Sequence, residues 1–216
     1  PLALPREVAR TPSGPDGVVK FLLEMADGER VETVWIPADG RVTQCVSSQV
    51  GCAMHCAFCA SGQLGCVRSL AAGEIVGQVM ALARAQGRYP NNIVVMGMGE
   101  PFMNYDAVLR ALRTLNLQQG PNIGARHITL STCGVVPGIE RLAGEGVQFE
   151  LSVSLHAPTD ALRDRLMPVN RRWPIAELLA ACDAYTAATG RIITYEYTLV
   201  GGLNDRPAHA DALIRL

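Results

Sequence analysis

Apolar and polar residues alternate with the period of a β-strand on both sides of an early turn signal. Residues 18–25 and 30–37 flank Ala26-Asp27-Gly28-Glu29, and this arrangement predicts a β-hairpin. Residues 1–17 contain four prolines and little periodicity, so we expect an extended lead-in. We expect residues 1–41 to form this extension and residues 42–216 to form a second unit.

From Arg41 onward, short apolar strands alternate with amphipathic helices. The predicted strands are 43–48, 92–98, 127–132, 149–156 and 192–200, and the predicted helices are 72–86, 105–117, 136–144, 159–166 and 175–189. This alternation indicates βαβ units and a parallel sheet of the α/β class. A last predicted helix, 207–216, runs to the end of the sequence without a capping residue, so we expect a fragment.

Three of the predicted strands carry a polar face. In 149–156 the side chains of Glu150, Ser152, Ser154 and His156 alternate with apolar ones, and 127–133 and 193–199 show the same pattern. A parallel strand covered by helices on both sides would be apolar on both faces. The pattern therefore favours a barrel or partial barrel with a polar ligand at its carboxyl-terminal strand ends, the alternative being an exposed sheet face.

Composition narrows the class of protein. With 216 residues and 49% hydrophobic residues the chain can form a globular core, which excludes disordered and collagen-like classes. It has neither a long uncharged apolar run nor a basic-apolar leader, so we expect a cytoplasmic protein without a membrane segment. The net charge of −1 does not by itself indicate nucleic acid binding.

Three of the seven cysteines lie on one short loop after the first predicted barrel strand. Cys52, Cys56 and Cys59 favour a metal or redox site over a secreted disulfide framework. Thiolates select zinc, copper(I) or iron–sulfur clusters, and three of them would leave one iron of a [4Fe–4S] cluster without a protein ligand. The alternative is a closed structural site completed by Cys45 or Cys66; His55 is interpreted as a spacer.

Several ordered motifs resemble the RlmN and Cfr family of radical S-adenosylmethionine RNA methyltransferases, and RlmN in particular. The matching segments include the cysteine loop with Phe58 and extend over 45–52, 97–101, 129–132, 154–158 and 167–170. The resemblance implies a partial (β/α)6 TIM-like barrel preceded by the hairpin. This chain would then be truncated before its last barrel strand, and it also lacks the family's N-terminal helical domain.

The resemblance also implies two cofactors. Cys52, Cys56 and Cys59 would hold a [4Fe–4S] cluster, whose remaining iron binds the amino and carboxyl groups of S-adenosylmethionine. The cofactor-binding residues implied by the matching motifs are Gly99, Glu100, Ser131, Ser154, Leu155 and His156. The cofactor supplies the difficult chemistry, and the protein supplies position and electrostatics.

Two residues receive catalytic roles from the resemblance. Cys45 matches the thiol that releases the product through a transient disulfide with a methyl-carrying cysteine, and Glu32 matches the acceptor of the proton from the adduct carbon. The other interpretations are a small buried side chain for Cys45 and a solvated glutamate for Glu32. No cysteine follows Cys182 in the sequence, so the methyl-carrying cysteine lies beyond this chain.

The implied activity is methylation of adenine C2 in 23S rRNA and tRNA by a monomer that takes electrons from a donor such as a flavodoxin. Pro101 favours C2 over C8. The alternatives are a C8-methylating relative, a truncated inactive iron–sulfur protein, modification of another substrate, or a structural or RNA-binding module. Phosphate contacts are a hypothesis for Arg68, Arg163, Arg165, Arg171 and Arg172, which are otherwise exposed helix charges. Cys66, Cys133 and Cys182 are assigned to packing.

Overall fold

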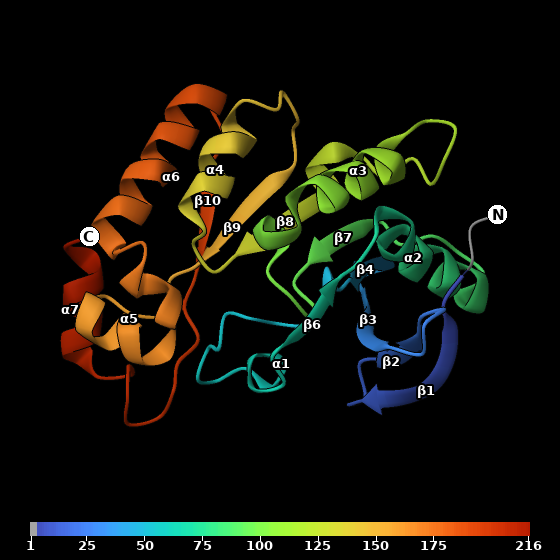
Figure 1. Cartoon of the computed structure of the whole chain (residues 1–216), viewed down its shortest axis with the longest axis horizontal. Helices are drawn as coiled ribbons and strands as arrows, with labels where there is room; N and C mark the ends of the chain where they lie inside the picture. The colour runs from blue at the N-terminus through green and yellow to red at the C-terminus, as the bar shows by residue number, and fades with distance from the viewer. Residues whose placement is uncertain (1–3) are drawn as a thin grey trace.

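A single eight-stranded sheet runs through the molecule in the computed structural model, which describes residues 4–216 (Figure 1). Its strand order is β1-β2-β3-β4-β7-β8-β9-β10, and β5 and β6 form a separate pair. The strands are β1 Arg6–Ser13, β2 Val18–Glu24, β3 Arg30–Ala38, β4 Arg41–Cys45, β5 Gln49–Gly51, β6 Cys66–Ser69, β7 Asn92–Val95, β8 Ile128–Thr132, β9 Glu150–Ser154 and β10 Ile193–Glu196.

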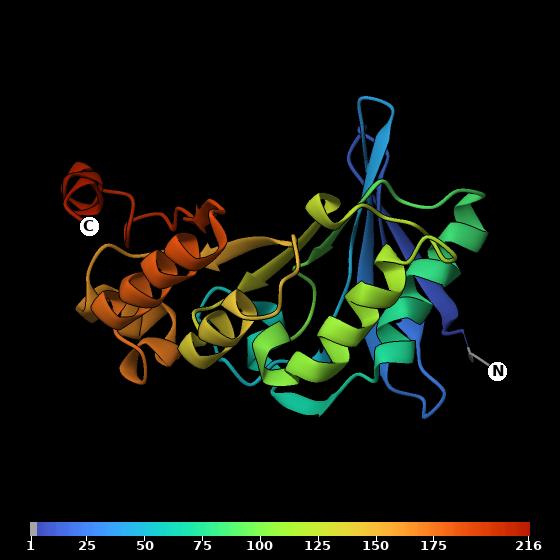
Figure 2. The same ribbon diagram turned by 90° about the horizontal axis from the view of Figure 1, so that it is seen from above.

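Seven α-helices connect or follow the strands in the described residues. They are α1 Ala60–Gln63, α2 Ala72–Gln86, α3 Tyr105–Asn116, α4 Val136–Ala143, α5 Asp160–Leu166, α6 Ile175–Thr189 and α7 Pro207–Ile214, with short 3₁₀ turns at Pro101–Asn104, Ala125–His127 and Pro168–Arg171. Helices α2, α3, α4 and α6 follow one another along one side of the curved sheet (Figures 1 and 2). Within residues 4–216 no helix has the length and apolar character that crossing a membrane requires.

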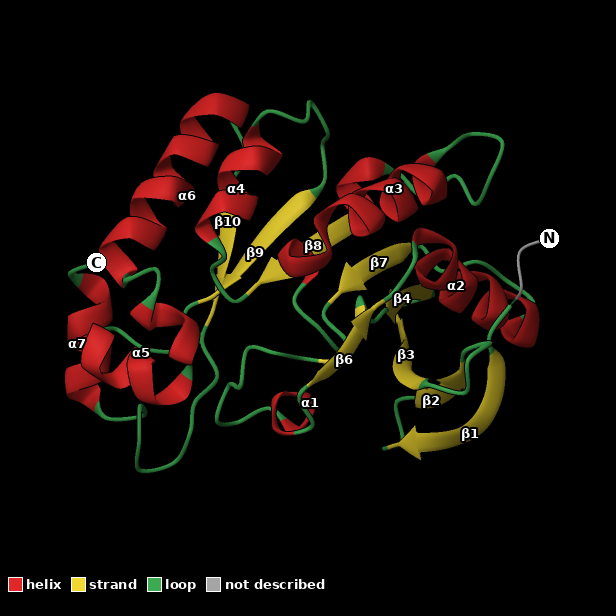
Figure 3. Cartoon of the chain, viewed as in Figure 1, coloured by secondary structure: helices red, strands yellow, loops and turns green. Residues whose placement is uncertain are grey.

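The first four strands are antiparallel neighbours and form the strand-rich end of the molecule (Figure 3). The hairpin β2–β3 confirms the prediction, and its turn is closed by the Met25 N–H donating to the Glu29 carbonyl at 2.7 Å. The expectation of an unpaired lead-in is wrong for residues 6–13, which form strand β1 against β2. Pro12 is tolerated there because β1 is an edge strand. Residues 1–3 of the expected lead-in lie outside the described part.

Strands β4, β7, β8, β9 and β10 are all parallel to their neighbours, as the alternation of strands and helices predicts. Helices α2 and α6 have the predicted bounds because each is followed by a glycine in the left-handed conformation, Gly87 at φ 71° and Gly190 at φ 65°. The fold is therefore the expected α/β partial barrel with an antiparallel extension.

The predicted polar faces are confirmed on β8 and β9 and not on β10. In β8, Ile128 and Leu130 are buried toward the helices, while Thr129 and Ser131 are half-buried on the opposite face. On β10 and beyond it, Tyr195 and Leu199, expected on the apolar face, are 42% and 71% exposed. The reason is that β10 ends the sheet, since among the described residues it pairs only with β9.

Candidate cofactor site

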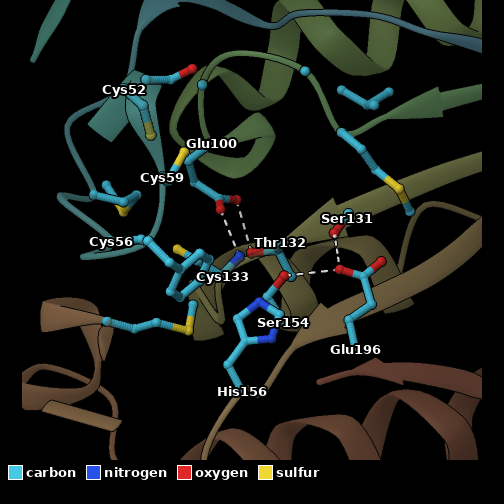
Figure 4. A pocket seen from close by; sticks show the side chains of 18 residues that line it. Cys52, Cys56, Cys59, Glu100, Ser131, Thr132, Cys133, Ser154, His156 and Glu196 are labelled. Carbon is cyan, nitrogen blue, oxygen red and sulfur yellow. Dashed lines mark hydrogen bonds between the residues drawn. The ribbon is translucent and has the colours of Figure 1, made fainter. Parts of the chain in front are cut away.

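A cavity of about 220 Å³ opens at the carboxyl-terminal ends of the parallel strands (Figure 4). Its wall includes eight of the residues singled out from the sequence: Cys52, Cys56, Cys59, Gly99, Glu100, Ser131, Ser154 and His156. These residues come from the loop after β4 and from the ends of β7, β8 and β9. The fold therefore brings together side chains that are up to about a hundred positions apart in the sequence.

The cysteine loop is closed at its base by the small sheet β5–β6, which the sequence did not predict. A Cβ atom on Gly51 would lie 1.9 Å from the Gly65 carbonyl oxygen, so only glycine permits this approach, and the Cys52 N–H donates to the same oxygen at 2.8 Å. His55 adopts φ 53°, and its Nδ1 lies 2.9 Å from the Gly62 carbonyl, which supports its interpretation as a structural residue.

The loop is also fixed to the far side of the barrel. The Ala57 N–H donates to the Leu166 carbonyl at the end of α5, 2.8 Å away. Burial raises the pKa of Cys52 and raises that of Cys56 to about 12, so these thiols are neutral at pH 7 without a cation to stabilise their thiolates. An iron cluster supplies that positive charge.

The donor set fits a cluster better than a single ion. Thiolate sulfur is the ligand that iron–sulfur clusters take. Among residues 4–216, no group of three or more His, Cys, Asp or Glu side chains is arranged closely enough for one metal ion. Cluster ligands each bind a different iron and therefore stand further apart than the ligands of a zinc ion.

Glu100 is a buried carboxylate held by three donors. Its Oε1 accepts from the Phe102 N–H at 3.0 Å and the Thr132 hydroxyl at 2.8 Å, and its Oε2 accepts from the Cys133 N–H at 2.8 Å (Figure 4). Burial raises the pKa of Glu100, and the three donors oppose that rise. Since a carboxylate offers about four acceptor positions, one remains on Oε2 for a donor in the cavity.

Gly97 and Gly99 approach the protein's own backbone. A Cβ on Gly97 would lie 2.8 Å from the Val46 carbonyl oxygen, and a Cβ on Gly99, which adopts φ 101°, would lie 2.6 Å from Cβ of Gln49. The Glu100 N–H in turn donates to Gln49 Oε1 at 2.9 Å. The glycines therefore let the end of β7 pack against the segment after β4, and this packing places Glu100.

His156 lies in the cavity wall as a neutral ring. It adopts φ 55°, its Nδ1 accepts from the Thr198 N–H at 3.0 Å, and the Phe58 ring packs edge-on at 4.8 Å between centroids. Burial, with the nearby Arg163 charge, lowers the pKa of His156 to about 4. Because Nδ1 accepts, the ring proton is on Nε2, which is therefore a hydrogen-bond donor.

Glu196 is a cavity residue to which the sequence analysis gave no role. Its carboxylate accepts hydrogen bonds from Ser131 and Ser154. The alternating polar face of the predicted strand 192–200 was the only sequence signal for it, because its partners lie on two other strands.

Arg163 is fully buried and does not bind phosphate, contrary to the hypothesis from the sequence. Its guanidinium donates to the carbonyls of Cys133, Ser154 and Leu155 at 2.7 to 3.1 Å and to Asn170 Oδ1 at 3.0 Å. It thereby ties the ends of β8 and β9 to the turn after α5. Arg68 is likewise engaged, by ion pairs with Asp27 and Glu74.

Three predicted residues do not line the cavity. Leu155 is buried and contributes backbone contacts, donating to the Glu196 carbonyl at 3.0 Å. Cys45 is buried at the end of β4, and burial raises its pKa to about 11. Glu32 lies on β3 with its carboxylate 2.7 Å from Lys20 Nζ, and its carbonyl accepts from Ser47 Oγ, which also contacts the Met98 N–H near the cavity.

The remaining cysteines differ from one another. Cys182 is buried in α6, as the packing assignment expected, whereas Cys66 is exposed on β6 and the packing assignment is wrong for it. Cys133 is buried but also lines the cavity, and its backbone joins Glu100 to Arg163. All seven cysteines are free thiols, so a disulfide within these residues is not present.

Comparison with known proteins identifies the group to which this site belongs. The sequence pattern of the Radical SAM superfamily matches residues 46–213. A crystal structure of a radical SAM methyltransferase from Sphaerobacter thermophilus superposes with a TM-score of 0.93 at 51% identity, covering 98% of this chain and 63% of that one.

Two curated relatives carry the name probable dual-specificity RNA methyltransferase RlmN. The one from Thermosynechococcus vestitus is 52% identical over 93% of this chain, and the one from Pelotomaculum thermopropionicum is 47% identical over 100% of it. The chain spans 59% and 58% of their lengths. The resemblance noted from the motifs is confirmed, and the chain belongs to the Radical SAM superfamily.

Proposed function

We propose that this chain is the cofactor-binding core of a radical S-adenosylmethionine RNA methyltransferase that methylates adenine C2 in 23S rRNA and tRNA. The observation that carries the proposal is the cavity itself, in which three cysteines of one loop face Glu100, Ser131, Ser154 and His156. In this proposal residues 42–216 form the catalytic barrel and residues 1–41 its extension. The enzyme acts as a cytoplasmic monomer that receives electrons from a protein donor such as a flavodoxin.

Cys52, Cys56 and Cys59 hold the [4Fe–4S] cluster in this proposal, and its open iron binds S-adenosylmethionine. When bound, these cofactors supply a one-electron cleavage that yields a 5′-deoxyadenosyl radical. The chain's own residues position the cofactor: Glu100 offers its remaining acceptor position to the methionine ammonium as a charge-assisted hydrogen bond. The aromatic and apolar wall around Phe58 and Met167 limits the access of water.

Glu32 and Cys45 act outside the cavity wall, on the RNA side of the proposed reaction. Glu32 is half-exposed and accepts the proton from the adduct carbon, with Lys20 holding its carboxylate. Cys45 releases the product by attacking a methylated cysteine outside this chain, which forms a transient disulfide. Because Cys45 is a neutral buried thiol in the present conformation, this step requires the strand end to open and the thiol to lose its proton.

Anaerobic reconstitution with iron and sulfide tests the cofactor assignment. We expect a brown protein that cleaves S-adenosylmethionine to 5′-deoxyadenosine on reduction, and we expect Cys52→Ala, Cys56→Ala and Cys59→Ala to lose both properties. The matched control is Cys66→Ala, an exposed cysteine beside the loop that lines no part of the cavity. A colourless protein with one tightly bound zinc, or an equal loss in Cys66→Ala, contradicts the assignment.

The substrate is tested separately with the protein that carries the methylated cysteine. Nucleoside analysis of treated 23S rRNA and tRNA should give 2-methyladenosine. Formation of 8-methyladenosine would identify the C8-methylating relative instead. A cluster that cleaves S-adenosylmethionine without methylating either RNA would contradict the RNA substrate while leaving the cofactor assignment intact.

A further inference from the structure

Glu196 joins the ends of three neighbouring strands. From the end of β10, its Oε2 accepts from Ser131 Oγ on β8 at 3.2 Å and from Ser154 Oγ on β9 at 3.0 Å (Figure 4). Its backbone carbonyl accepts from the N–H groups of Leu155 and His156 at 3.0 and 3.2 Å. All three side chains are half-buried and line the cavity.

These contacts determine which way the hydrogen bonds of this wall point. A serine hydroxyl has one proton, and both serines donate theirs to Glu196 Oε2. Toward a ligand the two hydroxyl oxygens therefore act only as acceptors. Glu196 Oε1 has no hydrogen-bond partner among residues 4–216 and is an acceptor as well.

A ligand at this wall must therefore bring its own donors. The cavity lining contains no lysine or arginine, and the donor from the protein, His156 Nε2, comes from the strand end beyond Ser154. A vicinal diol matches a carboxylate with a free oxygen, because two neighbouring hydroxyls can both donate to it. A nucleotide inside an RNA chain has its 3′ oxygen in a phosphodiester, so the free diol belongs to a separate nucleoside.

We propose that Glu196 binds the ribose diol of the S-adenosylmethionine cofactor, with Ser131 and Ser154 as supporting acceptors that Glu196 orients. This inference rests on the proposed function, since it assumes that the cavity binds this cofactor. It assigns a binding role to a residue of β10 and gives the two serines a defined polarity.

The test is calorimetric binding of S-adenosylhomocysteine, which cannot react, to the reconstituted chain. A hydrogen bond to a charged group is worth enough that Glu196→Ala should weaken binding by about 10- to 100-fold, and Glu196→Gln by about 10-fold. The matched control is Glu140→Ala, an exposed glutamate of α4 that loses the same charge away from the cavity. Iron content and thermal unfolding confirm that each variant keeps its cluster and fold.

Analogues locate the contact on the ligand. The 2′-deoxy and 3′-deoxy analogues should bind the wild type more weakly than the parent compound, and Glu196→Ala should weaken their binding less than it weakens that of the parent. If the loss in Glu196→Ala disappears instead with an analogue that lacks the amine, Glu196 binds the ammonium and the proposal is overturned. Unchanged affinity in Glu196→Ala and Glu196→Gln overturns it as well. If the wild type itself binds no S-adenosylhomocysteine, the proposed function fails together with this assignment.

Discussion

His156 is a neutral histidine at pH values where a free histidine is partly charged, because its ring is buried beside Phe58 and its Nδ1 accepts a backbone N–H. Its pKa is lowered to about 4, whereas the unfolded side chain titrates near 6.5. Between these values the unfolded chain binds a proton that the folded chain does not. Folding stability contributed by this residue is therefore present above pH 6.5 and is lost as the pH falls toward 4.

We predict that His156→Asn flattens this part of the stability profile. Asparagine tolerates the positive φ of position 156 and does not titrate, so the substitution removes the proton linkage without adding backbone strain. The wild type should lose on the order of 2 kcal/mol more than the variant between pH 6.5 and 4. Urea unfolding of the cluster-free chain at several pH values measures this, and parallel profiles for the two proteins would contradict it.

Arg163 is a buried cation whose hydrogen bonds hold three parts of the cavity floor together. We predict that Arg163→Met destabilises the chain by about 3 kcal/mol or more, because three carbonyls and the Asn170 amide oxygen lose their donors. Arg165→Met on the same helix is the control, since that exposed side chain should change stability by only about 0.5 kcal/mol. Similar unfolding midpoints for the two variants would show that Arg163 contributes little.

At the scale of elements, the cavity depends on how closely helix α4 packs on the turn Pro101–Asn104. A Cβ on Gly138 would lie 2.4 Å from the Phe102 ring, and the Phe102 N–H holds Glu100. Glycine in a helix is ordinarily less favourable than alanine, so its presence here is explained by this close contact.

We predict that Gly138→Ala costs about 1–3 kcal/mol through overpacking and displaces the Phe102 turn. Gly144→Ala, at the end of the same helix, is the control because its Cβ would lie 3.6 Å from the Arg141 carbonyl oxygen, an ordinary contact. That variant should be neutral or more stable by about 0.4–1 kcal/mol. Thermal unfolding compares them, and a neutral Gly138→Ala would show that the interface has room.

At the scale of the whole molecule, burial is uneven from the sheet centre to its ends. Helix α6 buries five residues against the rest of the fold, whereas α7 buries none, and the strand before α7 is the last of the sheet. A short helix without buried apolar contacts gains little from tertiary packing and opens readily.

We predict that amides of α7 exchange with solvent much faster than those of α6. Hydrogen exchange followed by mass spectrometry on the isolated chain should show α7 exchanged at the earliest times and α6 among the last segments. Equal protection of the two helices would contradict the packing described for this end of the molecule.

Much of the fold was predictable because its signals are local. The bounds of α2 and α6 follow from helical periodicity ended by Gly87 and Gly190, and the hairpin follows from one turn between two alternating strands. Strand β1 was missed because prolines mask the pattern of an edge strand. The β5–β6 pair was missed because it is short and depends on the close approach of Gly51 to Gly65.

By itself, the sequence determined the order of elements, the trio of cysteines on one loop and the polar faces of β8 and β9, since each depends on residues close together along the chain. Only the tertiary structure decided that Arg163 is buried, that Cys66 is exposed and that Glu196 meets Ser131 across 65 positions. Those outcomes depend on which strand ends become neighbours in the sheet. No local pattern of side chains specifies that arrangement before the chain has folded.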